Sequence, residues 1–170
     1  MDPEKAAQQL LSDIGLESPP VDVEVVAKHL GVHVERAEFG NDCSGVLVRK
    51  GESAMVGVHW GHHPNRQRFT IAHELGHFKL HSGGTYIDKS TTARFRLNQS
   101  GSGSEAEERQ ANQFAAALLM PAKWVRSEFV KRSFDLGDDQ ALSELCEVFQ
   151  VSSQAMLWRL KNLKLLDHLA

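Results

Sequence analysis

The chain has 170 residues, of which 41% are hydrophobic and 24% charged, and its formal net charge is -3 at pH 7. This length suits one domain, or one domain with a short appendage, and the slightly acidic balance argues against a generally basic nucleic-acid-binding protein. No apolar stretch reaches the roughly 18 residues that span a bilayer, and residues 1–9 are polar rather than signal-like. We therefore expect a soluble cytoplasmic protein with no membrane partner.

Two helices followed by three short strands are predicted in the N-terminal part. Residues 3–16 carry apolar side chains at helical spacing, and Asp22 can cap a second helix. The β-branched side chains of residues 32–35 then alternate with polar ones, as in a strand. Two more strands, residues 46–49 and 54–59, are separated by a short loop that is typical of a hairpin. The simplest product is an antiparallel sheet of about three strands.

An H-E-x-x-H motif at His73, Glu74 and His77 is the most informative feature of the chain. Because an α-helix has about 3.6 residues per turn, the two imidazoles lie on one face and can bind one catalytic zinc ion. Glu74 can act as the general base that moves a proton from the activated water to the leaving amine. The alternative is an amphipathic surface helix with two unrelated histidines. The flanking apolar residues favour the metal site, because buried polar groups need partners; they are Phe69, Ile71, Ala72, Leu75, Phe78 and Leu80.

The remaining chain is predicted to be a polar loop followed by helices. Residues 82–104 are rich in Gly, Ser and Thr, and a loop of that length is either disordered or a lid over a functional site. Helical spacing resumes at residues 105–120, Pro121 can open a further helix, and two more helices fit residues 139–166. The sequence thus predicts an α+β fold.

A third metal ligand is expected from the helix that begins near Glu105, because catalytic zinc sites commonly have three protein ligands. Glu105, Glu107 and Glu108 all open this helix, and Glu108 is favoured because it lies three residues before Ala111 and four before Asn112, on the packed face. Asn112 could accept a proton from a ligand imidazole and fix its tautomer. Alternatively, the three acids only complement the helix dipole.

His81 lies four residues beyond His77, which raises the question of a third histidine ligand. If the helix continues, His81 lies about 6 Å further along its axis than His77. The metzincin arrangement uses a different spacing and a glycine after the helix. We therefore expect His81 to contact a ligand or to pack in the core, without binding the metal.

Residues 141–165 have the spacing of a helix-turn-helix, with Ser152 and Ser153 at the turn. DNA reading requires cations that contact phosphates, and Arg159, Lys161 and Lys164 are few in an acidic protein. Packing against the catalytic part, or docking of a protein substrate, is therefore favoured over DNA binding. Nothing in the sequence indicates an oligomeric state.

The chain resembles the ImmA/IrrE family of zinc metallopeptidases. Two blocks carry the resemblance: residues 68–77 followed by His81, and Glu108 followed by residues 111–121. The resemblance implies a small gluzincin-like domain with zinc held by His73, His77 and Glu108. It also implies limited proteolysis of a helix-turn-helix transcriptional repressor, which derepresses mobile-element transfer or stress-response genes. The sequence differs from the family at Gln110, where an acid is common.

Two functional hypotheses follow. The first is a zinc endopeptidase with one Zn²⁺, which Mn²⁺ could replace, acting on a protein partner. The second is a non-catalytic, metal-containing regulatory module that engages DNA or a repressor through the helix-turn-helix-like segment. Both fit a metallopeptidase-like domain at residues 1–133, with a flexible loop at 82–104, and a helical segment at 134–170 packed on it.

Overall fold

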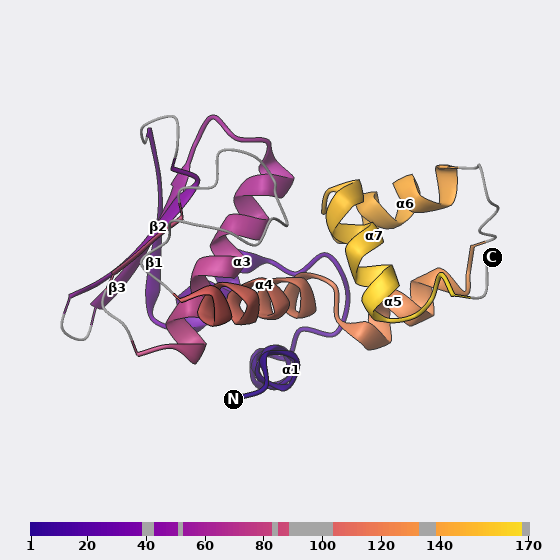
Figure 1. Cartoon of the computed structure of the whole chain (residues 1–170), viewed down its shortest axis with the longest axis horizontal. Coiled ribbons are helices and arrows are strands. Elements are labelled where there is room, and N and C mark those ends of the chain that lie inside the picture. Colours follow the sequence, from indigo (N-terminus) through magenta and orange to yellow (C-terminus); the bar gives the residue numbers. More distant parts are fainter. Residues whose placement is uncertain (39–42, 51–52, 83–84, 89–103, 133–138, 168–170) are drawn as a thin grey trace.

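The computed structural model describes residues 1–38, 43–50, 53–82, 85–88, 104–132 and 139–167. These residues form seven helices and a four-stranded sheet, which confirms the predicted α+β class. In Figure 1 the sheet lies at one end of the molecule, α3 and α4 cross in the middle, and α5, α6 and α7 gather at the other end.

The first two helices are α1, Pro3–Ile14, and α2, Val23–His29. Asp2 and Asp22 cap them by accepting hydrogen bonds from backbone N–H groups of the first turn, which satisfies donors that a helix start leaves unpaired. The cap predicted at Asp22 is therefore confirmed.

The sheet contains β1, Val32–Ala37; β2, Gly45–Lys50; β3, Ser53–His59; and β4, Thr85–Asp88, in the order β1-β3-β2-β4. The prediction of an antiparallel sheet is wrong for one pair, since β1 and β3 run parallel, and the sheet is mixed. Alternating hydrophobicity reports which face of a strand is buried and not the direction of its neighbour. The chain direction reverses between β1 and β2 and again between β2 and β3, so β3 runs parallel to β1, with which it pairs.

Strand β4 lies inside the segment that was predicted to be a loop, so that prediction is wrong for Thr85–Asp88. The strand forms because β2 offers it an antiparallel edge, where Val46 pairs with Ile87 and Leu47 with Tyr86. Residues 83–84 and 89–103 of the predicted lid lie outside the described residues.

The long helix α3, Pro64–Leu80, lies between the sheet and α4, Glu105–Leu119. Helix α4 agrees with the predicted residues 105–120, whereas α3 contains the apolar run of residues 69–80 but begins before it. His63 caps it by accepting from the Asn65 N–H, and Pro64 stands at its first position, where a missing N–H costs nothing.

The C-terminal helices are α5, Ala122–Phe129; α6, Gln140–Phe149; and α7, Ser153–Asn162. The α6–α7 pair buries one apolar face, and its largest fully buried side chains are Leu145, Phe149, Met156 and Leu160. The predicted boundary between residues 133 and 134 falls at the edge of a range that the structure does not describe, and the division into two units stays a prediction. Among the described helices, none is both long and apolar enough to cross a membrane.

Candidate metal centre

Helix α3 is buried on all sides through its middle, since every residue from Thr70 to His77 is buried. The sheet covers one side of this stretch and α4 covers another (Figure 1). His73 and His77 are 6% and 1% exposed, and Glu74 is 0% exposed. Buried polar side chains need partners, so this stretch of α3 is a candidate for a functional site.

The crossing of α3 and α4 depends on a residue without a side chain. A Cβ on Gly76 would lie 3.1 Å from both the Cα and the carbonyl oxygen of Ala111, which is itself fully buried. The two backbones therefore approach more closely than larger residues allow. This approach brings Glu108 and Asn112, which flank Ala111 on α4, to the histidines of α3.

Three ligating groups converge at this crossing. The Nε2 atoms of His73 and His77 lie 3.1 Å apart, and each lies 3.3 Å from a carboxylate oxygen of Glu108. A tetrahedral zinc site with bonds of about 2.0 to 2.1 Å has ligand atoms about 3.3 Å apart. The spacing of His73, His77 and Glu108 therefore fits a single divalent ion, and within the described ranges they form the one group of at least three potential ligand residues whose ligand atoms lie this close together.

The other two acids at the start of α4 have different partners. Glu107 forms a capping box with Ser104, in which the backbone N–H of Ser104 donates to the Glu107 carboxylate over 2.7 Å. The Glu105 carboxylate accepts a hydrogen bond from Arg109 over 3.0 Å. Of the three candidate acids, the structure brings Glu108 to the histidines and leaves Glu105 and Glu107 at the helix start.

The charges of the site suit a metal ligand set. Burial would raise the pKa of the Glu108 carboxyl, but hydrogen bonds and Coulombic attraction from His73 and His77 outweigh it and hold this pKa well below its usual range. Burial lowers the pKa of the His77 imidazole, and His73 and His81 lower it further against the opposing effect of Glu108. An ionised carboxylate and a neutral imidazole are the forms that bind metals.

A family model described as the IrrE N-terminal-like domain matches residues 27–161, which is most of the chain. The chain belongs to this peptidase family. The match includes α3 and α4 with all three potential ligands, and it confirms the family resemblance that the two sequence blocks indicate. No curated protein matches the chain.

In this IrrE-like domain, His73 and His77 each have a further polar partner that is not one of the three potential ligands. The Oδ1 atom of Asn112 lies 3.1 Å from Nδ1 of His73, and Nδ1 of His81 lies 3.1 Å from Nδ1 of His77. The structure thus places both residues where they can fix the orientation of a ligand ring. His81 follows the last residue of α3 and is 9% exposed.

Gln110 is a further contact, one that the sequence did not single out. Its Oε1 atom lies 3.0 Å from Nε2 of His81. Helical periodicity puts Gln110 on a different side of α4 from Glu108, so the sequence carries no local signal for this contact. The sequence marks Gln110 only as a difference from the family and does not predict this contact.

Arg49 on β2 is a second residue that sequence reasoning missed. Its Nη2 atom donates to the carbonyls of His77, Phe78 and His81 at 3.0, 2.9 and 2.7 Å, and its guanidinium stacks 4.9 Å from the Phe78 ring centroid. The last carbonyls of a helix lack partners within the helix, and a cation there also complements the helix dipole. Arg49 therefore fixes the turn that carries His77 and His81.

The Glu74 side chain lies close to Gly45, the first residue of β2. A Cβ on Gly45 would lie 3.3 Å from Oε1 of Glu74 and 2.3 Å from Cγ2 of Thr70, so only glycine allows the strand to pass this close to the helix. The Glu74 carboxylate is thus enclosed between α3 and the sheet, next in sequence to His73.

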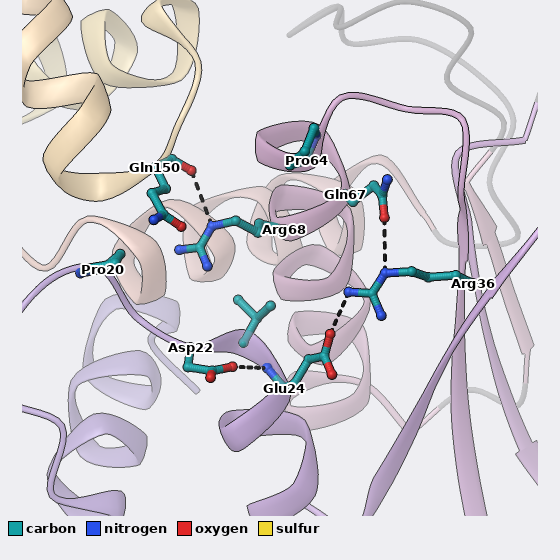
Figure 2. A pocket seen from close by; sticks show the side chains of 9 residues that line it. Pro20, Asp22, Glu24, Arg36, Pro64, Gln67, Arg68 and Gln150 are labelled. Carbon is teal, nitrogen blue, oxygen red and sulfur yellow. Dashed lines mark hydrogen bonds and ion pairs between the residues drawn. The ribbon is translucent and has the colours of Figure 1, made fainter.

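A pocket of about 610 Å³ lies away from the metal centre, between α2, the end of β1, the start of α3 and the α6–α7 turn. Figure 2 shows Arg36 paired with Glu24 on one side, and Arg68 reaching Gln150 on the other. Arg68 donates to the carbonyls of Gln150 and Val21, while Asn65 donates to the carbonyl of Val151. The first half of α3 therefore holds the turn that precedes α7.

Proposed function

We propose that the protein is a zinc-dependent endopeptidase. The observation that carries the proposal is the convergence of His73, His77 and Glu108, with the buried Glu74 next to His73 in sequence, in a chain that belongs to a peptidase family. Two imidazole nitrogens and one carboxylate form a donor set that zinc uses in peptidases. When bound, the ion supplies Lewis-acid polarisation of the scissile carbonyl.

Glu74 acts as general base and then as general acid in this proposal. Its carboxylate removes a proton from water as the water oxygen bonds to the carbonyl carbon. The same proton then passes to the amide nitrogen as the carbon–nitrogen bond breaks, so that the leaving group departs as a neutral amine. The burial of Glu74 limits competition from bulk water for this proton.

The proposed substrate is a protein partner, with a helix-turn-helix transcriptional repressor as the expected class in a stress or mobile-element response. Membership of the IrrE-like family supports this class, because the ImmA/IrrE resemblance implies repressor cleavage. Zinc is the proposed ion because of the nitrogen-rich donor set, and Mn²⁺ is the alternative.

Arg159, one of the cations considered for DNA contact, is not available to bind DNA. Arg159 is 4% exposed, and its guanidinium donates to both carboxylate oxygens of Glu4 and to the carbonyl of Met120. This residue joins α7 to α1 and to the end of α4, so it stabilises the fold and does not face solvent. Its burial favours packing or substrate docking over DNA binding by α7.

The test compares Glu74→Gln with Glu105→Gln, a matched control at an exposed acid of α4. Glu74→Gln should retain the metal and the fold but lower cleavage of a co-expressed repressor by about 10²- to 10⁴-fold, as loss of a general base does. Glu105→Gln should cleave normally. Mass spectrometry of new termini in the repressor measures both. Equal cleavage by Glu74→Gln and wild type would exclude the proposed mechanism.

A further inference from the structure

We infer that Gln110 is a positioning residue of the metal centre: through His81, its amide determines which ring nitrogen of His77 carries the proton. The inference rests on the proposed metal site and deepens it. Three side chains form a series of hydrogen bonds: Oε1 of Gln110 lies 3.0 Å from Nε2 of His81, and Nδ1 of His81 lies 3.1 Å from Nδ1 of His77. His77 in turn presents Nε2 to Glu108 and His73.

The direction of this series follows from the hydrogen-bonding capacity of each group. The Oε1 atom of Gln110 can only accept, so Nε2 of His81 must donate to it. In a neutral imidazole the other nitrogen then has a lone pair, so Nδ1 of His81 accepts from Nδ1 of His77. His77 is left with an unprotonated Nε2, which is the atom that faces the other two potential ligands.

The opposite direction is incompatible with a metal at this site. If the amide nitrogen of Gln110 donated to His81, the protons would reverse along the series and His77 would carry its proton on Nε2. A protonated Nε2 has no lone pair for an ion. Binding of a metal by His77 therefore requires the carbonyl side of the Gln110 amide to face His81, as it does here.

The two ligand histidines thus depend on two amides of one helix. Asn112 accepts directly from Nδ1 of His73, while Gln110 acts on His77 through the intervening His81. Both amides lie on α4 beside Ala111, which contacts Gly76 at the helix crossing. The crossing that brings Glu108 to the histidines therefore also selects their tautomers.

The experiment uses the full chain with Zn²⁺ as the probe and compares Gln110→Met, Gln110→Glu and Gln113→Met. Met removes the acceptor at similar length, Glu restores an oxygen acceptor, and Gln113 is a matched exposed glutamine on the same helix. Zinc affinity is measured by competition with a chromophoric chelator. We expect Gln110→Met to weaken binding about 10-fold, a typical effect of losing an outer contact of a metal ligand. Gln110→Glu and Gln113→Met should stay within about twofold of wild type.

The tautomers themselves are read from imidazole ¹⁵N shifts of the labelled wild-type protein, with and without Zn²⁺. We expect protonated Nδ1 and unprotonated Nε2 on His77 in both states, and the opposite tautomer on His81. A proton on Nε2 of metal-free His77, or unchanged zinc affinity in folded Gln110→Met, would overturn the inference. Neither readout requires catalysis, so a correct tautomer in a protein that cleaves nothing would refute the proposed peptidase activity alone.

Discussion

The α3–α4 crossing and the α6–α7 pair bury different kinds of side chains. At the crossing, small residues such as Gly76 and Ala111 allow close contact, and the buried space holds His73, His77 and Glu74. In the α6–α7 pair, the buried space holds large apolar side chains, among them Leu145, Phe149, Met156 and Leu160. The first arrangement orients polar groups, and the second removes apolar area from water.

This difference separates two kinds of mutational effect. A change among the large apolar side chains of the α6–α7 pair should lower the free energy of unfolding and leave metal binding alone, because none of them is a potential metal ligand. A change that loosens the second half of α3 should weaken metal binding even where the loss of stability is modest.

The largest expected effect on stability is at Phe149, which is fully buried on α6. Phe149→Ala should lower the free energy of unfolding by about 3 to 5 kcal/mol, because it removes a large apolar group and leaves a cavity. Urea unfolding measures this, and zinc affinity of the folded variant should stay within twofold of wild type. Leu157→Ala, at a side chain 44% exposed on α7, is the control and should change stability by less than about 0.5 kcal/mol. A tenfold loss of zinc affinity in Phe149→Ala would break the separation.

A smaller effect on stability but a larger one on metal binding is expected at Arg49. Arg49→Met keeps the apolar stem and removes the three hydrogen bonds to the end of α3, which should cost about 2 kcal/mol of stability. Zinc binding should weaken about tenfold, because the turn that carries His77 and His81 loses its support. Lys50→Met, at the exposed neighbour on β2, is the control. Full zinc affinity in a folded Arg49→Met would show that Arg49 supports the helix without supporting the site.

The smallest effect concerns pH in the metal-free protein. Because burial lowers the pKa of His77 from its ordinary 6.5, the unfolded chain binds a proton at this residue more readily than the folded chain. The contribution of His77 to the free energy of unfolding is therefore fully present above pH 6.5, and it is lost as the pH falls toward the lower pKa of the folded state. Unfolding free energies at pH 7.5 and 5.5 should therefore differ more for wild type than for His77→Gln. An equal pH dependence of the two proteins would contradict the burial effect at His77.

The local parts of the structure were predictable from the sequence. Helix caps such as Asp22 and the i,i+4 spacing of His73 and His77 depend on a few adjacent residues, and both are present as predicted. Glu108 was preferred over two neighbouring acids because of its face on one helix, and the structure places it at the histidines. These features need no knowledge of which element lies next to which.

The parts that were missed depend on tertiary neighbours. Strand β4 forms only because β2 provides an edge, and the parallel pairing of β1 and β3 follows from the path of the chain. Arg49 and Gln110 act across elements, on the end of α3 and on His81 respectively. Neither periodicity nor motif spacing contains such contacts, since they arise only when the sheet and α4 pack on α3.

The most direct test is the metal content of the protein after loading with Zn²⁺ and removal of excess ion, measured by mass spectrometry of the elements. The wild-type protein and Glu105→Ala should each retain one equivalent of zinc, whereas His77→Ala and Glu108→Ala should retain much less than one. The assignment of His73, His77 and Glu108 as the metal centre would be contradicted if the wild-type protein retained no zinc after loading. A full equivalent of zinc in both His77→Ala and Glu108→Ala would contradict it as well.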